Sequence, residues 1–121
     1  MSKFFSDVFE RDCHRCVYCG RDMLVDFDTF MMVQEDHLVP KSHGGRDELD
    51  NIVTACAVCN LLKGDYCPEG IAPSKRPEYI ASIRAHIIQH RAERMADFTS
   101  WTCPTRPESK SQVAAAESGC A

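Results

Sequence analysis

Two cysteine pairs decide the fold: residues 16–20 read CVYCG, and residues 56–64 read CAVCNLLKG. The C-x2-C spacing lets both sulfurs of a pair reach one ion from a single turn, and two pairs supply the four thiolates of tetrahedral zinc. A glycine after Cys19 relieves crowding where the turn needs positive φ. The 36 residues between the pairs exceed the roughly 15–20 of common zinc-site patterns. They therefore form an insert between two zinc knuckles, by which we mean the two C-x2-C turns, the first at residues 16–19 and the second at residues 56–59. We therefore predict a structural zinc ion held by Cys16, Cys19, Cys56 and Cys59.

The other cysteines leave alternatives open. Cys13 offers a second pairing with Cys16, and Cys67 lies eight residues after Cys59. We favour Cys16 with Cys19 because only that pair is followed by glycine. In the competing interpretation all these sulfurs are buried or free thiols without metal. Four cysteines receive that interpretation and no assigned role: Cys13, Cys67, Cys103 and Cys120.

Length and charge restrict the class of protein. The chain has 121 residues, which suits one domain, and its 44% apolar residues suit a small core. Its longest apolar run is five residues, too short for a membrane span, and the N-terminus lacks a secretory signal. We therefore expect a cytoplasmic protein whose cysteines bind metal rather than form disulfides. The net charge of −4 argues weakly against a nucleic-acid partner, although residues 1–68 carry all of the excess acidity.

Apolar spacing predicts a small α+β domain over residues 1–103, and residues 104–121 have the composition of a disordered tail. The spacing indicates an N-terminal helix, two strands, a short helix ended by glycine, and a C-terminal helix over about residues 77–101. The first four of these elements are Lys3–Arg11, Asp28–His37, Ile52–Ala55 and Val58–Gly64.

The C-terminal helix carries an apolar stripe from Ile80 to Trp101. We expect this stripe to pack against the rest of the domain, and the alternative is a surface for a protein partner. The opposite face is either a solvated surface or a face that contacts phosphates. Its residues are Arg84, His86, His90, Arg91 and Arg94.

Between and beside the cysteine pairs, residues 35–45 read EDHLVPKSHGG, residues 50–53 read DNIV and residues 59–64 read CNLLKG. This ordered set over residues 16–64 resembles the HNH endonucleases of the ββα-metal type. An Asp-His pair alone is weak evidence, whereas the ordered set inside a four-cysteine frame is specific. The resemblance implies a ββα-metal nuclease domain that hydrolyses phosphodiester bonds of DNA, by nicking or double-strand cleavage, to leave 5′-phosphate and 3′-hydroxyl ends.

The chemistry of these residue types agrees with that resemblance. A histidine takes a proton from water near neutral pH, and a divalent ion with oxygen ligands stabilises charge on a phosphate. Because Asp36 and His37 are adjacent near a strand end, their side chains point to opposite sides. One then ligates metal while the other faces the attacking water. Asn60 directly follows the last zinc ligand, so zinc fixes the start of the helix that presents it.

The resemblance also implies residue roles. His37 becomes the general base, Asp36 a ligand of the catalytic ion, and Asn51 the residue that braces the loop and orients the base. Asn60 takes the third position, where the name-giving residue is histidine, and its amide oxygen shifts the expected ion toward Mg2+ or Mn2+. Two residues complete the predicted site as substrate contacts. Lys63 is either a surface charge or a phosphate contact, and His43 is a plain surface histidine by its own sequence that lies near enough to touch substrate.

Two other classes of protein remain as alternatives. The first is an inactive, zinc-stabilised module that binds nucleic acid, which has no use for Asp36, His37 or Asn60. The second is an adaptor that binds protein through the C-terminal stripe. Since no specificity module is recognisable, we expect low sequence specificity or a protein partner that supplies it. A bound cation neutralises Asp36, so the acidic balance predicts weak, salt-sensitive DNA binding rather than none.

Overall fold

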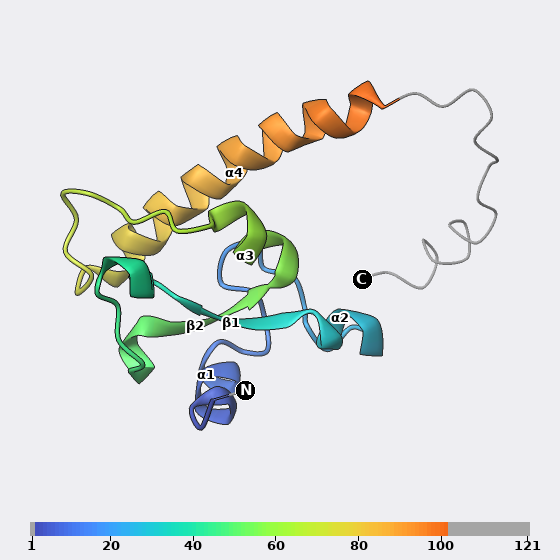
Figure 1. Cartoon of the computed structure of the whole chain (residues 1–121). Coiled ribbons are helices and arrows are strands. Elements are labelled where there is room, and N and C mark those ends of the chain that lie inside the picture. The colour runs from blue at the N-terminus through green and yellow to red at the C-terminus, as the bar shows by residue number, and fades with distance from the viewer. Residues whose placement is uncertain (1, 102–121) are drawn as a thin grey trace.

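The computed structural model describes residues 2–101, and the tail predicted for residues 104–121 lies outside them. An antiparallel two-stranded sheet lies between helices on its two sides (Figure 1). This arrangement confirms the predicted α+β class. The helices and strands are α1 Phe5–Arg11, α2 Phe27–Met31, β1 Val33–His37, β2 Ile52–Cys56, α3 Ala57–Lys63 and α4 Arg76–Ser100.

The hairpin and α3 form the centre of the molecule. Asp36 pairs with Val53 and His37 with Ile52, so β1 carries the Asp-His pair beside the fully buried strand β2. Helix α3 begins directly after β2, where the Cys56 sulfur accepts the backbone N–H of Cys59 at 3.4 Å. It ends at Gly64, whose φ of 57° lies in the left-handed region. The short helix predicted from the sequence is therefore confirmed.

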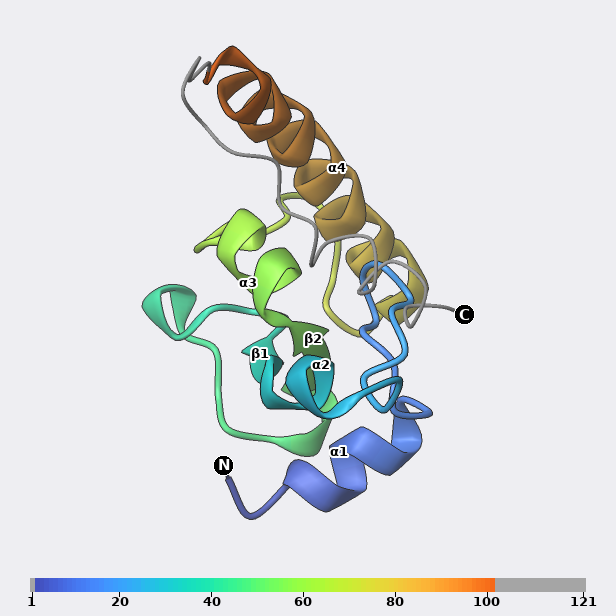
Figure 2. The same ribbon diagram turned by 90° about the vertical axis from the view of Figure 1, so that its right-hand side faces the viewer.

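Helix α1 packs on β2, on the side of the sheet away from α3 (Figure 2). Phe5 and Phe9, one turn apart, stack at a centroid distance of 5.1 Å, and Phe9 is buried in the core. The end of the helix is fastened to β2 by polar contacts. Asp12 accepts the backbone N–H of Thr54 at 2.8 Å, and Arg11 donates to the Ile52 carbonyl.

The predicted strand over Asp28–His37 is wrong in its first half, where the chain forms α2. Asp26 accepts the backbone N–H of Thr29 at 2.7 Å, which is an N-cap, and Asp28 adds a carboxylate to the first turn. The pKa of Asp26 is lowered by this hydrogen bond. The local cap thus overrides the strand propensity of the apolar residues, and β1 begins only at Val33.

Helix α4 crosses α3 and extends past it, as Figure 1 shows. The predicted packing is confirmed for its first half, where Tyr79, Ile83 and Ile87 are buried in the core. It is wrong for the second half, because the helix runs beyond the elements that would cover it. Phe98 and Trp101 are 69% and 83% exposed. None of the described helices is long and apolar enough to span a membrane.

Candidate functional site

Four sulfurs converge where the turn after α1 meets the start of α3. One ligand atom from each of four cysteines lies within 4.8 Å of the others, and the Cys19 and Cys56 sulfurs are 3.8 Å apart. A Zn–S distance of about 2.3 Å requires sulfur separations of about 3.8 Å in a tetrahedron, so the cluster has the size of a zinc site. The set is the predicted one: Cys16, Cys19, Cys56 and Cys59.

The two competing cysteines lie elsewhere. The Cys13 thiol is exposed and lies 4.0 Å from the Arg11 carbonyl, and the Cys67 sulfur contacts the Tyr79 hydroxyl at 3.6 Å. Gly20 has the positive φ, 78°, that the sequence anticipated after Cys19. The sulfur of Cys16 thus lies in the cluster and that of Cys13 lies outside it.

Ionisation is uneven among the sulfurs of the cluster. Thiol groups of Cys16 and Cys59 donate to Cys56 and lower its pKa to about 3, with help from the Cys59 backbone N–H. The pKa of Cys59 is raised, because its thiol is a donor in the same cluster and a second thiolate there meets the charge of the first. A divalent cation removes that repulsion and allows all four sulfurs to ionise.

Asp36 lies under α3, and both of its carboxylate oxygens already contact side chains of the protein. The Tyr18 hydroxyl donates to Oδ2 at 2.5 Å, and the Lys63 ammonium lies 3.3 Å from the same oxygen and 3.4 Å from Oδ1. Burial raises the pKa of Asp36, while the charge of Lys63 and the Tyr18 hydrogen bond oppose that rise. Burial beside this carboxylate in turn raises the pKa of Tyr18 well above its ordinary value.

Lys63 is the least expected member of this group. The sequence suggested a phosphate contact or a surface charge, but its side chain is only 1% exposed. Its ammonium group also donates to the His37 carbonyl at 2.8 Å. In this conformation Lys63 therefore contacts the two residues of the Asp-His pair and is enclosed away from any substrate.

His37 points to the opposite face of the sheet from Asp36. Its Nε2 lies 2.7 Å from an oxygen of Asp47, whose other oxygen accepts from Lys41 at 3.1 Å. These hydrogen bonds, His37 first, lower the pKa of Asp47. The ring lines a cleft of about 470 Å³ that also contains the side chains of Lys3 and Glu35. The side chains of Asp36 and His37 thus diverge, as their positions on the strand require.

Asn51 clamps the loop that follows β1. Its side-chain oxygen accepts the Val39 N–H at 2.8 Å, and its amide nitrogen donates to the carbonyls of Val39 and Arg46. Gly45 is part of the same packing, because a Cβ there would lie 1.7 Å from the Val39 carbonyl oxygen. Gly45 is consequently close-packed, whereas Gly44 beside it has a positive φ of 86° and open space around it.

The two remaining predicted residues lie near these groups but do not touch them. Asn60 donates to Gln34 at 3.4 Å, and Gln34 shares a face of β1 with Asp36 because the two are alternate residues. Asn60 therefore lies on the Asp36 side of the hairpin, one helical turn before Lys63. His43 is exposed on the short 3-10 turn that also carries Lys41 to the His37 cleft.

Sequence reasoning missed three contributors to this region. Tyr18 lies between two zinc ligands, and that position was its only available signal. Asp47 carries no local signal for its contact with His37, ten residues earlier. Arg84 of α4 donates to the Tyr18 carbonyl at 2.9 Å and to the Val17 carbonyl, so the long helix holds the first knuckle.

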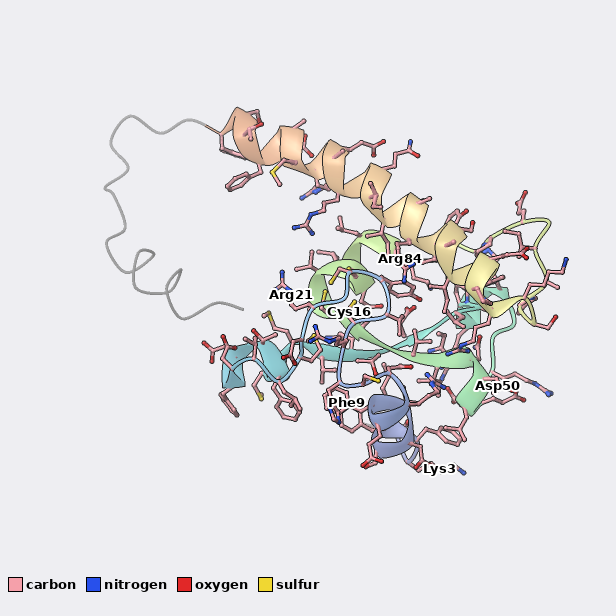
Figure 3. All side chains as sticks on the ribbon, turned by 180° about the vertical axis from the view of Figure 1, so that it is seen from behind. Lys3, Phe9, Cys16, Arg21, Asp50 and Arg84 are labelled. Carbon is pink, nitrogen blue, oxygen red and sulfur yellow. The ribbon has the colours of Figure 1, made fainter. Side chains whose placement is uncertain are left out.

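An arginine-rich groove lies beside the sulfur cluster. It has a volume of about 750 Å³ and is bordered by the first knuckle, the start of α3 and α4. Figure 3 shows Cys16, Arg21 and Arg84 on this side of the molecule. Its four arginines are Arg15, Arg21, Arg84 and Arg91.

The arginines of this groove differ in what they already bind. Arg15 donates to the Gly20 carbonyl, and Arg84 is held by the knuckle. Among the described residues, neither Arg21 nor Arg91 has a hydrogen-bonded or ion-paired side-chain partner. Most of the basic face anticipated on α4 is engaged within the protein, as the Arg94–Asp97 ion pair illustrates. Arg91 is the member of that face that remains available.

The donor chemistry of Asp36 and Asn60 suits a hard divalent cation. Carboxylate and amide oxygens are the ligands that Mg2+ and Mn2+ prefer, and both side chains lie on the α3 side of the hairpin. The residues fit such an ion on one condition. Since Asp36 is already bound by Lys63 and Tyr18, a cation gains that carboxylate only when Lys63 moves away.

Comparisons with known proteins agree with this arrangement. No curated protein and no solved structure matches the chain. The family model described as HNH endonuclease matches residues 16–66, a range that contains both cysteine pairs, the hairpin and α3. The match thus covers the zinc-type cluster, Asp36, His37, Asn51 and Asn60 together. Residues 16–66 of this chain are therefore similar to the HNH endonuclease family.

Proposed function

We propose that this protein is a metal-dependent endonuclease that hydrolyses phosphodiester bonds of DNA. The observation that carries the proposal is the placement of His37. Its ring lies in an open cleft, is hydrogen-bonded to Asp47, and follows the buried Asp36 within a segment of the HNH family. This arrangement combines a base that water can reach with an acidic residue on the other side of the same strand.

His37 is proposed to act as the general base. With Nε2–H donated to the Asp47 carboxylate, Nδ1 is left with the lone pair that accepts a proton from water. The resulting hydroxide attacks phosphorus, and the bond from phosphorus to the 3′ oxygen breaks. Asp47 stabilises the imidazolium that forms. The expected ends are a 5′-phosphate and a 3′-hydroxyl.

The proposal includes two kinds of metal. Zinc, held by the four-cysteine cluster, is structural and fixes the start of α3. Asp36 and Asn60 would hold Mg2+ or Mn2+. When bound, such an ion would supply positive charge that stabilises the phosphate and the departing oxygen. Asn51 keeps the loop after His37 closed, so the base keeps its orientation.

A plasmid assay tests the proposal. We expect purified protein to nick or cut supercoiled DNA with Mg2+ or Mn2+, and His37→Ala to lose about 10²-fold or more of the rate. The matched control is His14→Asn, which removes an imidazole from a residue with φ of 59°, a conformation that asparagine tolerates. Equal cleavage by His37→Ala and the parent would exclude His37 as the base.

The inactive DNA-binding module is the second candidate, and one observation favours it. Lys63 forms an ion pair with Asp36 in the structure, as expected of a site that no longer binds a metal ion. Retained DNA binding without cleavage under any divalent ion would support this second function. Nicking that depends on added Mg2+ or Mn2+ and on His37 would exclude it.

A further inference from the structure

Asp36 resembles a cation site in which the ammonium group of Lys63 takes the place of a metal ion. A buried carboxylate needs a compensating charge, and Lys63 supplies it at 3.3 Å with a side chain that is itself 1% exposed. Tyr18 fills a further position on the same oxygen. No polar side chain in the described residues is buried without a hydrogen-bond partner, so this small network is complete without a metal.

A divalent cation and the Lys63 ammonium exclude each other at this carboxylate. Both need the lone pairs of Asp36, and at such separations two positive charges repel strongly in a buried site. The side chain of Asp36 is only 7% exposed, so solvent does not provide a separate open approach. Binding of the ion therefore requires the ammonium group to leave.

Lys63 has the means to leave. Its charge is at the end of a flexible four-carbon chain in the last turn of α3, directly before the turn at Gly64. The backbone of α3 need not move, because the cysteine cluster holds its first turn. Tyr18, by contrast, lies between two cluster cysteines and donates a neutral hydrogen bond that is compatible with a bound cation.

We infer that Lys63 is an internal cation that holds Asp36 in the metal-free protein and is displaced when the catalytic divalent ion binds. This inference rests on the proposed function, because it concerns the same metal site. Displacement also places the freed ammonium beside the site, where it reaches a phosphate. Lys63 would then have two states. In one its ammonium group is buried against Asp36, and in the other it contacts a phosphate, as the sequence suggested.

Direct Mn2+ binding, measured by electron paramagnetic resonance without DNA, tests the inference. Lys63→Met removes the competing charge, and we expect the Kd for Mn2+ to fall by about tenfold or more. Lys63→Arg keeps a positive charge and is the matched control, with no such gain. Equal Kd values for Lys63→Met and the parent, or no Mn2+ binding by either, would overturn the inference.

A measurement on the unaltered protein keeps the test decisive if Lys63→Met does not fold. The buried ammonium of Lys63 should give a protected ¹⁵N signal, and Mg2+ should shift or broaden it with the midpoint of Mg2+ binding. An unchanged signal at saturating Mg2+ would overturn the displacement. Plasmid cleavage is scored separately: cleavage without displacement overturns only this inference, and displacement without cleavage overturns only the nuclease proposal.

Discussion

At the scale of single residues, Tyr18 connects the cysteine cluster to the buried carboxylate of Asp36. The side chain lies between two cluster cysteines, is buried, and donates to Asp36 at 2.5 Å. The second partner of Asp36, Lys63, comes from the helix that the other two cysteines begin. Both partners of the carboxylate are thus positioned by the sulfur cluster.

Replacing Tyr18 by phenylalanine removes the hydroxyl and leaves a buried carboxylate oxygen with one donor fewer. We expect the free energy of unfolding of the zinc-loaded protein to fall by about 1–3 kcal/mol, measured by urea denaturation. Tyr66→Phe is the control, because its hydroxyl meets only the neutral Ser82 hydroxyl at 2.9 Å. Tyr66→Phe should cost about 1 kcal/mol or less. A Tyr18→Phe protein as stable as the parent would contradict the role assigned to this hydrogen bond.

At the scale of elements, the loop between β1 and β2 is shaped by packing as well as by turn propensity. Gly44 has a φ of 86° and open space around it, whereas Gly45 lies against the Val39 backbone. The two glycines are therefore needed for different reasons, one conformational and one steric. This difference gives a matched pair of substitutions.

Gly45→Ala should destabilise the protein more than Gly44→Ala. Alanine at 44 costs about 1 kcal/mol because of the positive φ, whereas alanine at 45 forces the Val39 carbonyl aside and costs about 2 kcal/mol or more. Thermal unfolding of both variants measures the difference. Because Val39 is also clamped by Asn51, Gly45→Ala should reduce nicking as well. Equal melting temperatures would show that the loop yields easily.

Helix α4 contacts the turn between Cys16 and Cys19, and this contact borders the arginine-rich groove. Arg84 is held by backbone carbonyls, so the groove beside the cluster presents Arg21 and Arg91 to a ligand. The groove is locally basic although the whole chain is acidic, because its four arginines face one carboxylate, that of Asp22, and three of the cluster cysteines. We expect phosphates of DNA to bind there.

The double variant Arg21→Gln, Arg91→Gln should weaken DNA binding and reduce its salt dependence. Loss of two phosphate contacts lowers the slope of log K against log salt by about 2. Titrations in the His37→Ala background prevent cleavage from confusing the result. Arg94→Gln is the control, because Arg94 is paired with Asp97 at 3.6 Å. A slope unchanged in the double variant would place the DNA contact elsewhere.

At the scale of the whole molecule, we expect the small core to depend on the cysteine cluster for its stability. The cluster joins the turn after α1 to the start of α3, and α4 adds buried Tyr79, Ile83 and Ile87 over them. Loss of zinc would release both cluster segments, and with them both partners of Asp36. Stability and metal-site geometry are therefore expected to fail together.

Cys16→Ser should lose zinc and cooperative unfolding, whereas Cys13→Ser should retain both. Cys16 is buried in the cluster, and Cys13 is exposed outside it. Elemental analysis gives the zinc content per chain, and a thermal melt gives the cooperativity. The parent should also lose its transition when a strong chelator removes zinc. A zinc-free Cys13→Ser protein would contradict the assignment of ligands.

The sequence by itself determined the local features of this protein. Cysteine spacing, together with the glycine after Cys19, predicted which four sulfurs converge. The glycine after α3 predicted the end of that helix, and the adjacency of Asp36 and His37 predicted their opposite directions. Each prediction depends on residues close in the chain. A local signal also misled, since Asp26 starts a helix where strand-forming residues predicted a strand.

Only the tertiary structure decided the partners of the site. Asp36 and Lys63 are 27 residues apart, His37 and Asp47 ten, and Tyr18 and Asp36 eighteen. The overhang of α4 likewise depends on where α3 ends in space. Such contacts arise when elements pack, and burial then fixes which charges must pair. No spacing within the chain records them, because they form only when distant segments pack together, and burial then penalises any charge or polar group that is left unpaired.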